Sequence, residues 1–145
     1  MTFLLDRAGR RRGLGARLTG TEPTLPGLIA VVDDDASFRE AMTDILLFWG
    51  FGVEAFESAE QVLAWPGLQA FDAFLLDVQM PGLSGLQLID RLREGRVTAP
   101  VILVTSCNDP ATRKQAERAG ALSLLGKPFD TDELIGLLRQ ALACA

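Results

Sequence analysis

Histidine is absent from this sequence of 145 residues, and so is tyrosine. The absence of histidine excludes a Ser-His-Asp triad, a histidine-based metal site and any histidine that relays a phosphoryl group. Cysteine is scarce, because Cys107 and Cys144 are the only two in the chain and cannot form a disulfide framework. A reducing compartment is therefore the default expectation.

Long hydrophobic runs are also missing. The longest apolar runs are far too short to cross a bilayer, and the N-terminus lacks the hydrophobic region of a signal peptide. These absences predict a cytoplasmic protein. The remaining composition, with 48% hydrophobic residues, 23% charged residues and a formal net charge of −5, is that of an ordinary globular protein. The length suits one domain with a single core.

Positive charge is concentrated at the N-terminus. Residues 1–27 contain five arginines against Asp6 and Glu22, a net charge of +3, so residues 28–145 carry −8. This segment mixes Arg, Gly, Pro and Thr without apolar periodicity, which predicts a basic flexible tail at 1–27 and a folded domain at 28–145. The functional alternative for the tail is a basic arm that contacts nucleic acid or anionic lipid.

From residue 28 onward, short apolar runs alternate with segments of helical spacing. The runs begin near residues 28, 52, 73, 101 and 122. Each is followed by a helix-start signal, either a capping-box spacing or an N-cap with proline after it. These signals are Ser37–Glu40, Ser58–Gln61, Ser84–Gln87, Asp109–Pro110 (with Gly120 closing that helix) and Asp130–Glu133. Five such repeats predict an α/β fold, a doubly wound five-stranded parallel sheet with helices on both faces.

Polar residues stand where the predicted strands end. They are Asp33, Asp34 and Asp35 after the first strand, Asp77 in "LLDVQMPG" after the third, Thr105-Ser106 after the fourth and Lys127 after the fifth. All these ends share one edge of a parallel sheet, the edge at which such folds bind ligands. Converging carboxylates repel one another unless a cation is present, and oxygen ligands favour Mg²⁺. Together with a hydroxyl and an ammonium group, they suggest phosphoryl transfer onto an aspartate.

Four fragments carry a family resemblance. In order along the chain, "VVDDDASFREAM", "LLDVQMPGLSG", "VILVTS" and "LLGKPF" resemble the signature of the response-regulator receiver domain of bacterial two-component signalling. The match runs from about residue 28 to the C-terminus. The phrase "VEAFESAEQ" further resembles receivers of the nitrogen-fixation regulator subfamily. The resemblance implies a flavodoxin-like strand order 2-1-3-4-5.

The resemblance also implies a role for each strand-end residue. Asp77 would be the phosphoacceptor, Asp34 a direct Mg²⁺ ligand and Asp33 a ligand acting largely through water. The other implied features are the Gln79 backbone carbonyl as a further metal ligand, Thr105 as a switch hydroxyl, Lys127 as the partner of the phosphoryl group and a cis bond between Lys127 and Pro128. One position departs from the family: Leu124 stands where receivers usually carry Tyr or Phe, which puts the coupled hydroxyl–aromatic switch in doubt.

The function expected from this resemblance is that of a signalling receiver, not of a metabolic enzyme. It would accept a phosphoryl group from a histidine kinase or histidine phosphotransfer protein and change a surface that binds a downstream protein. Receivers of this type often pair through the helices that here begin at Asp109 and Asp130. Because the sequence ends after the last helix, a nucleic-acid-binding output domain is not expected, unless the sequence is a piece of a longer chain.

Two functions of other classes stay open. One is a phosphorylation-independent module that keeps the receiver fold as a scaffold, for which Leu124 leaves room. The other is a Mg²⁺-dependent phosphatase of the haloacid-dehalogenase type. The nucleophile motif of those enzymes, D-x-D-x-[TV], has a second aspartate that "DVQMP" lacks.

Several other residues are expected to play structural parts. Asp35 is expected to cap the first helix, and Cys107 to be a small residue near the pocket, with a redox role as the less favoured alternative. The aromatic residues are expected to pack in the core or at helix ends. These are Phe48, Trp49, Phe51, Phe56 and Trp65.

Overall fold

The computed structural model describes residues 4–5, 11–12 and 27–143. Near the N-terminus it places two short strands, β1 (Leu4–Leu5) and β2 (Arg11–Arg12), which pair antiparallel. The other residues before Gly27 lie outside the described part of the chain. The expectation of a flexible tail at residues 1–27 falls largely on them.

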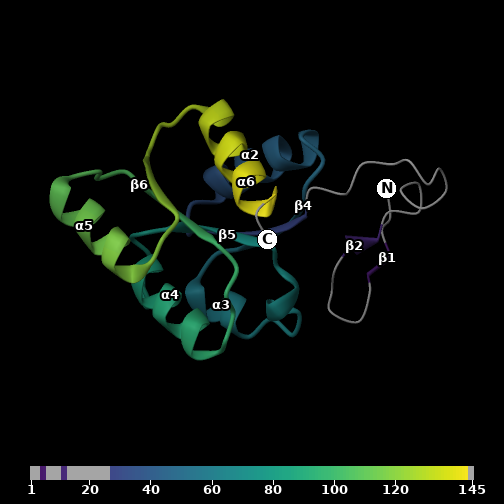
Figure 1. Ribbon diagram of the computed structural model, residues 1–145, viewed down its shortest axis with the longest axis horizontal. Helices are drawn as coiled ribbons and strands as arrows, with labels where there is room; N and C mark the ends of the chain where they lie inside the picture. The colour runs from purple at the N-terminus through teal and green to yellow at the C-terminus, as the bar shows by residue number, and fades with distance from the viewer. Residues whose placement is uncertain (1–3, 6–10, 13–26, 144–145) are drawn as a thin grey trace.

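The main sheet has five parallel strands (Figure 1). They are β3 (Leu28–Val32), β4 (Gly52–Phe56), β5 (Ala73–Asp77), β6 (Val101–Thr105) and β7 (Ser123–Gly126). Across the sheet their order is β4-β3-β5-β6-β7, which is 2-1-3-4-5 when these five are numbered along the chain. The predicted fold class and strand order are therefore confirmed.

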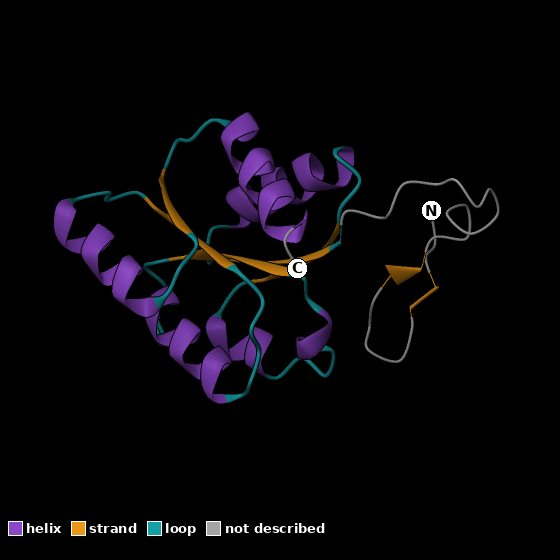
Figure 2. Ribbon diagram, in the orientation of Figure 1, coloured by secondary structure: helices purple, strands orange, loops and turns teal. Residues whose placement is uncertain are grey.

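Helices cover both faces of this sheet (Figure 2). On one face lie α2 (Ala36–Phe48) and α6 (Thr131–Ala143), and on the other lie α3 (Ala59–Leu63), α4 (Gly85–Glu94) and α5 (Pro110–Ala119). A short 3-10 helix, η1 (Leu68–Ala70), precedes β5. The buried side chains form two clusters, one under each helical layer. Residues on every described position of β3, β5 and β6 are buried, because these strands are covered from both sides.

Most of the predicted helix starts are confirmed, and one is wrong. Ser58, Ser84 and Asp109 are N-caps, and Ser84 with Gln87 forms a reciprocal capping box. The first helix is capped by Asp35, which confirms the other prediction for this helix: its carboxylate accepts from the backbone N–H groups of Ser37 and Phe38. Ser37 already lies inside α2, so Ser37–Glu40 is not a capping box. Asp35 takes this place because it directly precedes the first residue of α2, where a carboxylate reaches the free N–H groups of the first turn.

The aromatic residues divide between core and surface. Phe51 and Phe56 are buried, as expected, and Trp49 is half-buried at the end of α2. Phe48 is 82% exposed, and as the last residue of α2 it packs at the helix end, edge-to-face against Trp49 with 5.9 Å between ring centroids. Adjacent helical residues differ by about 100° in direction, and only one of Leu46, Leu47 and Phe48 can face the sheet. That residue is Leu46, which is fully buried.

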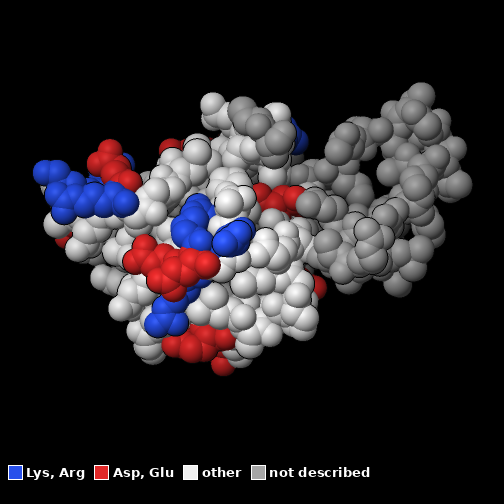
Figure 3. Space-filling model, turned by 60° about the horizontal axis from the view of Figure 1, so that its bottom comes forward, with Lys and Arg blue, Asp and Glu red and all other residues white. Residues whose placement is uncertain are grey.

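The edge where the strands begin carries no cluster of carboxylates among the described residues. A hollow of about 840 Å³ opens there, lined mainly by apolar residues that include Val97, Pro100, Leu122 and Leu137. On the face shown in Figure 3, basic and acidic side chains lie close together, and no extended region of that face has one sign. Within the part of the chain that the structure describes, no helix combines the length and hydropathy needed to cross a membrane.

Candidate functional site at the carboxyl edge of the sheet

Strand register brings the predicted acidic residues together. Val32, the last residue of β3, pairs with Leu76 of β5, so Asp33 and Asp77 leave the sheet side by side. Carboxylate oxygens of Asp33, Asp34 and Asp77 all lie within 4.8 Å of one another. Asp33 is fully buried and Asp77 is 7% exposed, whereas Asp34 is exposed. Three carboxylates at this spacing form a group that a divalent cation could bind.

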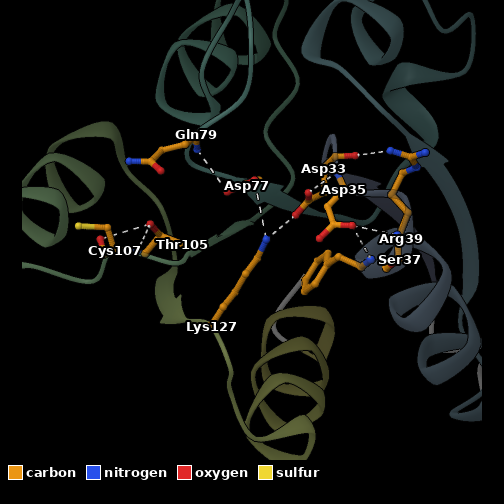
Figure 4. Close-up of polar contacts among 10 residues, drawn as sticks. Asp33, Asp35, Ser37, Arg39, Asp77, Gln79, Thr105, Cys107 and Lys127 are labelled. Carbon is orange, nitrogen blue, oxygen red and sulfur yellow. Dashed lines mark hydrogen bonds and ion pairs between the residues drawn. The ribbon is translucent and has the colours of Figure 1, made fainter.

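Lys127 is the counterion of this group. It extends from the end of β7 between Asp77 and Asp33 (Figure 4). Its Nζ donates a hydrogen bond to Asp33 Oδ2 at 2.7 Å and lies 3.8 Å from Asp77 Oδ2. The peptide bond between Lys127 and Pro128 is cis, which confirms the expectation from the family resemblance. One ammonium group facing two buried carboxylates leaves the site with an excess of negative charge.

The excess of negative charge contributes to a raised pKa of the Asp77 carboxyl group. Burial and then the charge of Asp33 raise the pKa of Asp77 from its ordinary value of 3.8 to about 6. The ammonium of Lys127 and the N–H of Gln79, which donates to Asp77 Oδ1 at 3.2 Å, act in the opposite direction. Asp77 is therefore still largely ionised near neutral pH, but in an unfavourable environment that a cation would relieve.

Replacing this carboxylate is expected to stabilise the metal-free protein. Because the pKa of Asp77 is higher in the folded state, folding favours its protonated form, and stability falls as pH rises from about 4 to about 6. Asp77→Asn removes this loss of stability, because asparagine does not ionise. In chelator at pH 7.5 we expect the unfolding free energy of the variant to exceed that of the wild type by about 2 kcal/mol. The gain should shrink as pH is lowered through 6 and vanish near pH 4. Denaturant titrations of both proteins at these pH values measure it, and a gain independent of pH would contradict the assignment.

Thr105 is the last residue of β6, and its buried hydroxyl is already engaged. Oγ1 accepts a hydrogen bond from the Cys107 backbone N–H at 3.0 Å and donates to the Cys107 backbone carbonyl at 3.2 Å. The Cys107 thiol is exposed and donates to Asp109 Oδ2 at 3.4 Å. This hydrogen bond raises the pKa of the thiol, which disfavours a reactive thiolate. The expectation that Cys107 is a small loop residue agrees with this geometry.

The loop after β5 fixes the orientation of Asp77. The Gly85 N–H at the start of α4 donates to the Val78 carbonyl at 2.9 Å, which draws the helix against the backbone that carries Asp77. Glu60 of α3 accepts a hydrogen bond from the Leu83 N–H at 3.3 Å and so ties the same loop to its neighbour. The Gln79 side chain is exposed. Its backbone remains beside Asp77 through the N–H described above.

Two neighbours of the site were missed by sequence reasoning. Arg39 on α2 donates from Nη1 to the Asp33 backbone carbonyl at 2.8 Å, and its Nη2 lies 3.9 Å from Glu57 Oε2. Phe38 presents its ring to Lys127, with Nζ 4.1 Å from the ring centroid. The cap at Asp35 is the feature of the sequence from which both could have been predicted. A helix that begins there places Phe38 and Arg39 in its first turn, next to the end of β3.

Leu124 lies in β7, three residues before Lys127. It is 7% exposed and belongs to the cluster of buried side chains under α3, α4 and α5. A residue with this packing is part of the core of that layer. The position at which the family resemblance leads us to expect an aromatic residue is therefore filled by an aliphatic side chain held inside the domain.

Comparison with known proteins gives consistent matches. Residues 29–139 match the family described as the response regulator receiver domain. The chain is 37% identical over 120 residues to the transcriptional regulatory protein FixJ of Bradyrhizobium diazoefficiens, covering 82% of this chain and 58% of that protein. It is 35% identical over 117 residues to the DNA-binding transcriptional regulator NtrC of Salmonella typhimurium, covering 81% of this chain and 25% of that protein. This chain thus spans less than two thirds of the length of either relative.

Comparison with solved structures agrees with the fold. A response regulator from Chloroflexus aurantiacus superposes with a TM-score of 0.75 at 31% identity, covering 81% of this chain and 98% of that one. The family resemblance read from the four sequence fragments is confirmed by these matches. The chain belongs to the family of response regulator receiver domains of two-component signalling.

Proposed function

We propose that this receiver accepts a phosphoryl group on Asp77 from a histidine kinase or histidine phosphotransfer protein, in a Mg²⁺-dependent step. The observation that carries the proposal is the juxtaposition of three carboxylates within 4.8 Å and an ammonium group facing two of them. Of the three carboxylates, that of Asp77 is buried, faces Lys127 and belongs to the last residue of β5, which is the middle strand of the sheet. The reducing cytoplasm is the compartment we propose for this exchange.

The donor set fits Mg²⁺. Asp34 is exposed and can bind a cation directly, whereas both oxygens of Asp33 are already engaged, with the Asp35 N–H at 2.8 Å and with Lys127. We therefore assign Asp34, Asp77 and the Gln79 backbone carbonyl as direct ligands, and Asp33 as a ligand through water. When bound, Mg²⁺ supplies positive charge that neutralises the phosphoryl oxygens during transfer.

The bond changes in the proposed step are simple. A carboxylate oxygen of Asp77 attacks the phosphorus of a phosphohistidine on the partner protein. The phosphorus–oxygen bond forms as the phosphorus–nitrogen bond breaks, and the electron pair stays with the imidazole, which leaves and takes up a proton. Lys127 follows the developing charge and pairs with the phosphoryl group. The chain's catalysis is limited to its own phosphorylation and the hydrolysis that reverses it.

Thr105 then provides the switch. Its hydroxyl would release the Cys107 backbone and donate to the phosphoryl group, which shifts the segment between β6 and α5. Because Leu124 is aliphatic and buried, the signal would pass through this segment and α5 without rotation of an aromatic side chain. The downstream partner would be a protein that recognises the shifted surface.

The test is the intact mass of the protein after incubation with acetyl phosphate, with and without Mg²⁺. We expect one added phosphoryl group that requires Mg²⁺, and no adduct with Asp77→Asn. The matched control is Asp35→Asn, since Asn also caps helices well and Asp35 lies outside the three-carboxylate group. It should be phosphorylated like the wild type. A wild-type protein that gains no mass would support the phosphorylation-independent scaffold instead.

A further inference from the structure

The ammonium group of Lys127 has a third neighbour besides its two carboxylates. Nζ lies 4.1 Å from the centroid of the Phe38 ring, well within the distance at which a cation is attracted by an aromatic face. The Lys127 side chain is only 22% exposed, so water screens this attraction incompletely. Asp33 and Asp77 attract the ammonium electrostatically, and the ring occupies a further part of its surroundings.

The Phe38 ring is itself held in a defined place. It packs edge-to-face against Phe129, with 6.2 Å between ring centroids and 73° between ring planes. Phe129 follows Lys127 by two residues, so this contact joins α2 to the segment that carries the lysine. On the other side, the Asp35 cap fixes the first turn of α2. Arg39, the residue after Phe38, donates from Nη1 to the Asp33 carbonyl at 2.8 Å. These contacts place the ring between the segment that carries Asp33 and the segment that carries Lys127.

We propose that Phe38 is a positioning residue, whose ring face holds the Lys127 ammonium at the place where the phosphoryl group forms on Asp77. This inference rests on the proposed function. Without the ring, the flexible four-carbon stem of Lys127 gains conformations that point toward solvent. The carboxylates alone then select the productive conformation less strongly. The residue touches the lysine, not the phosphoryl donor, so its effect on transfer is indirect.

The test compares Phe38→Leu, which keeps apolar volume but removes the ring face, with Phe38→Tyr, which keeps the face. Lysine signals are easily assigned by nuclear magnetic resonance, because the chain contains only Lys114 and Lys127. Lys114 is exposed on α5 and serves as the internal reference. In the wild type and in Phe38→Tyr, the ring current should shift the Lys127 Hε protons upfield of those of Lys114. In Phe38→Leu that difference should disappear.

The second readout is the rate of adduct formation with acetyl phosphate and Mg²⁺. We expect Phe38→Leu to react about tenfold more slowly than the wild type, and Phe38→Tyr to restore the rate. An unshifted Lys127 signal in the wild type, or an unchanged rate in Phe38→Leu, would overturn the role of Phe38. The failure of the proposed function looks different, because the wild type itself would then form no adduct while its Lys127 signal remained shifted.

Discussion

Lys127→Met is expected to form the aspartyl phosphate about 100-fold more slowly than the wild type, or more slowly still. Methionine keeps an unbranched apolar stem but removes the Lys127 ammonium, which faces Asp33 and Asp77. The incoming phosphoryl group brings further negative charge to a site that already has an excess of it. Loss of the positive charge therefore penalises the transition state more than the resting protein. The rate is measured by intact mass with acetyl phosphate at saturating Mg²⁺.

The same substitution removes the ion pair of the fully buried Asp33, so stability must be measured beside the rate. An unpaired buried charge destabilises a protein by about 3 kcal/mol or more. Mg²⁺ should restore part of this loss in Lys127→Met, because it supplies positive charge to the same carboxylates. The control is Lys114→Met, which changes the other lysine of the chain on the exposed side of α5. A folded, Mg²⁺-stabilised Lys127→Met that reacts at the wild-type rate would contradict the role of Lys127.

Gly85→Ala is expected to lower the free energy of unfolding by about 3 kcal/mol. A Cβ atom at Gly85 would overlap the Asp77 backbone carbonyl oxygen and would lie 3.0 Å from the Asp77 carbonyl carbon and 3.1 Å from the Val78 Cα. These are backbone atoms, so no side-chain rotation can relieve the overlap. The start of α4 must move away from β5, which weakens the Gly85–Val78 hydrogen bond and packing against the buried Leu88 and Ile89.

A second glycine in a helix provides the control for Gly85→Ala. Gly136 lies in α6, and a Cβ atom there would have no neighbour within 4 Å. Gly136→Ala should raise the free energy of unfolding by roughly 0.5–1 kcal/mol, because alanine restricts the unfolded chain and favours the helix. Denaturant titration measures both variants. Equal effects at the two positions would show that helix propensity, and not the contact with Asp77, decides the outcome at Gly85.

Much of the fold could be predicted because the apolar runs are short and their ends are polar. β3, β4, β5 and β6 begin at the residues where their runs begin, and β7 begins one residue after its own. The convergence of Asp33, Asp77, Thr105 and Lys127 followed from parallel strands alone, since such strands end at one edge. Their chemical roles came from the family resemblance and not from this geometry.

What the sequence did not show was which contacts Asp33 and Asp34 make, although it did predict the cap at Asp35. Asp33, Asp34 and Asp35 are consecutive, yet one pairs with Lys127, one is exposed and one caps α2. The position of Asp33 depends on contacts with distant parts of the chain, because its N–H donates to the Phe56 carbonyl at 3.1 Å and its Oδ2 accepts from Lys127 at 2.7 Å. The Phe38–Lys127 contact was invisible for the same reason. It joins the first helix to the last strand, and no local pattern records that approach.

Gly126, the residue before Lys127, shows how the lack of a side chain can join two parts of a protein. The space that a Cβ atom would occupy there is taken by Asn108, with its Cβ and Nδ2 each 3.1 Å from that point. Asn108 Oδ1 in turn accepts a hydrogen bond from Arg113 Nη2 of α5 at 3.0 Å. The segment that Thr105 would shift thus rests directly on the segment that carries Lys127. A movement of the segment after β6 would therefore be felt directly at the segment that carries Lys127. The absence of a side chain at Gly126 is what allows the two segments to pack this closely.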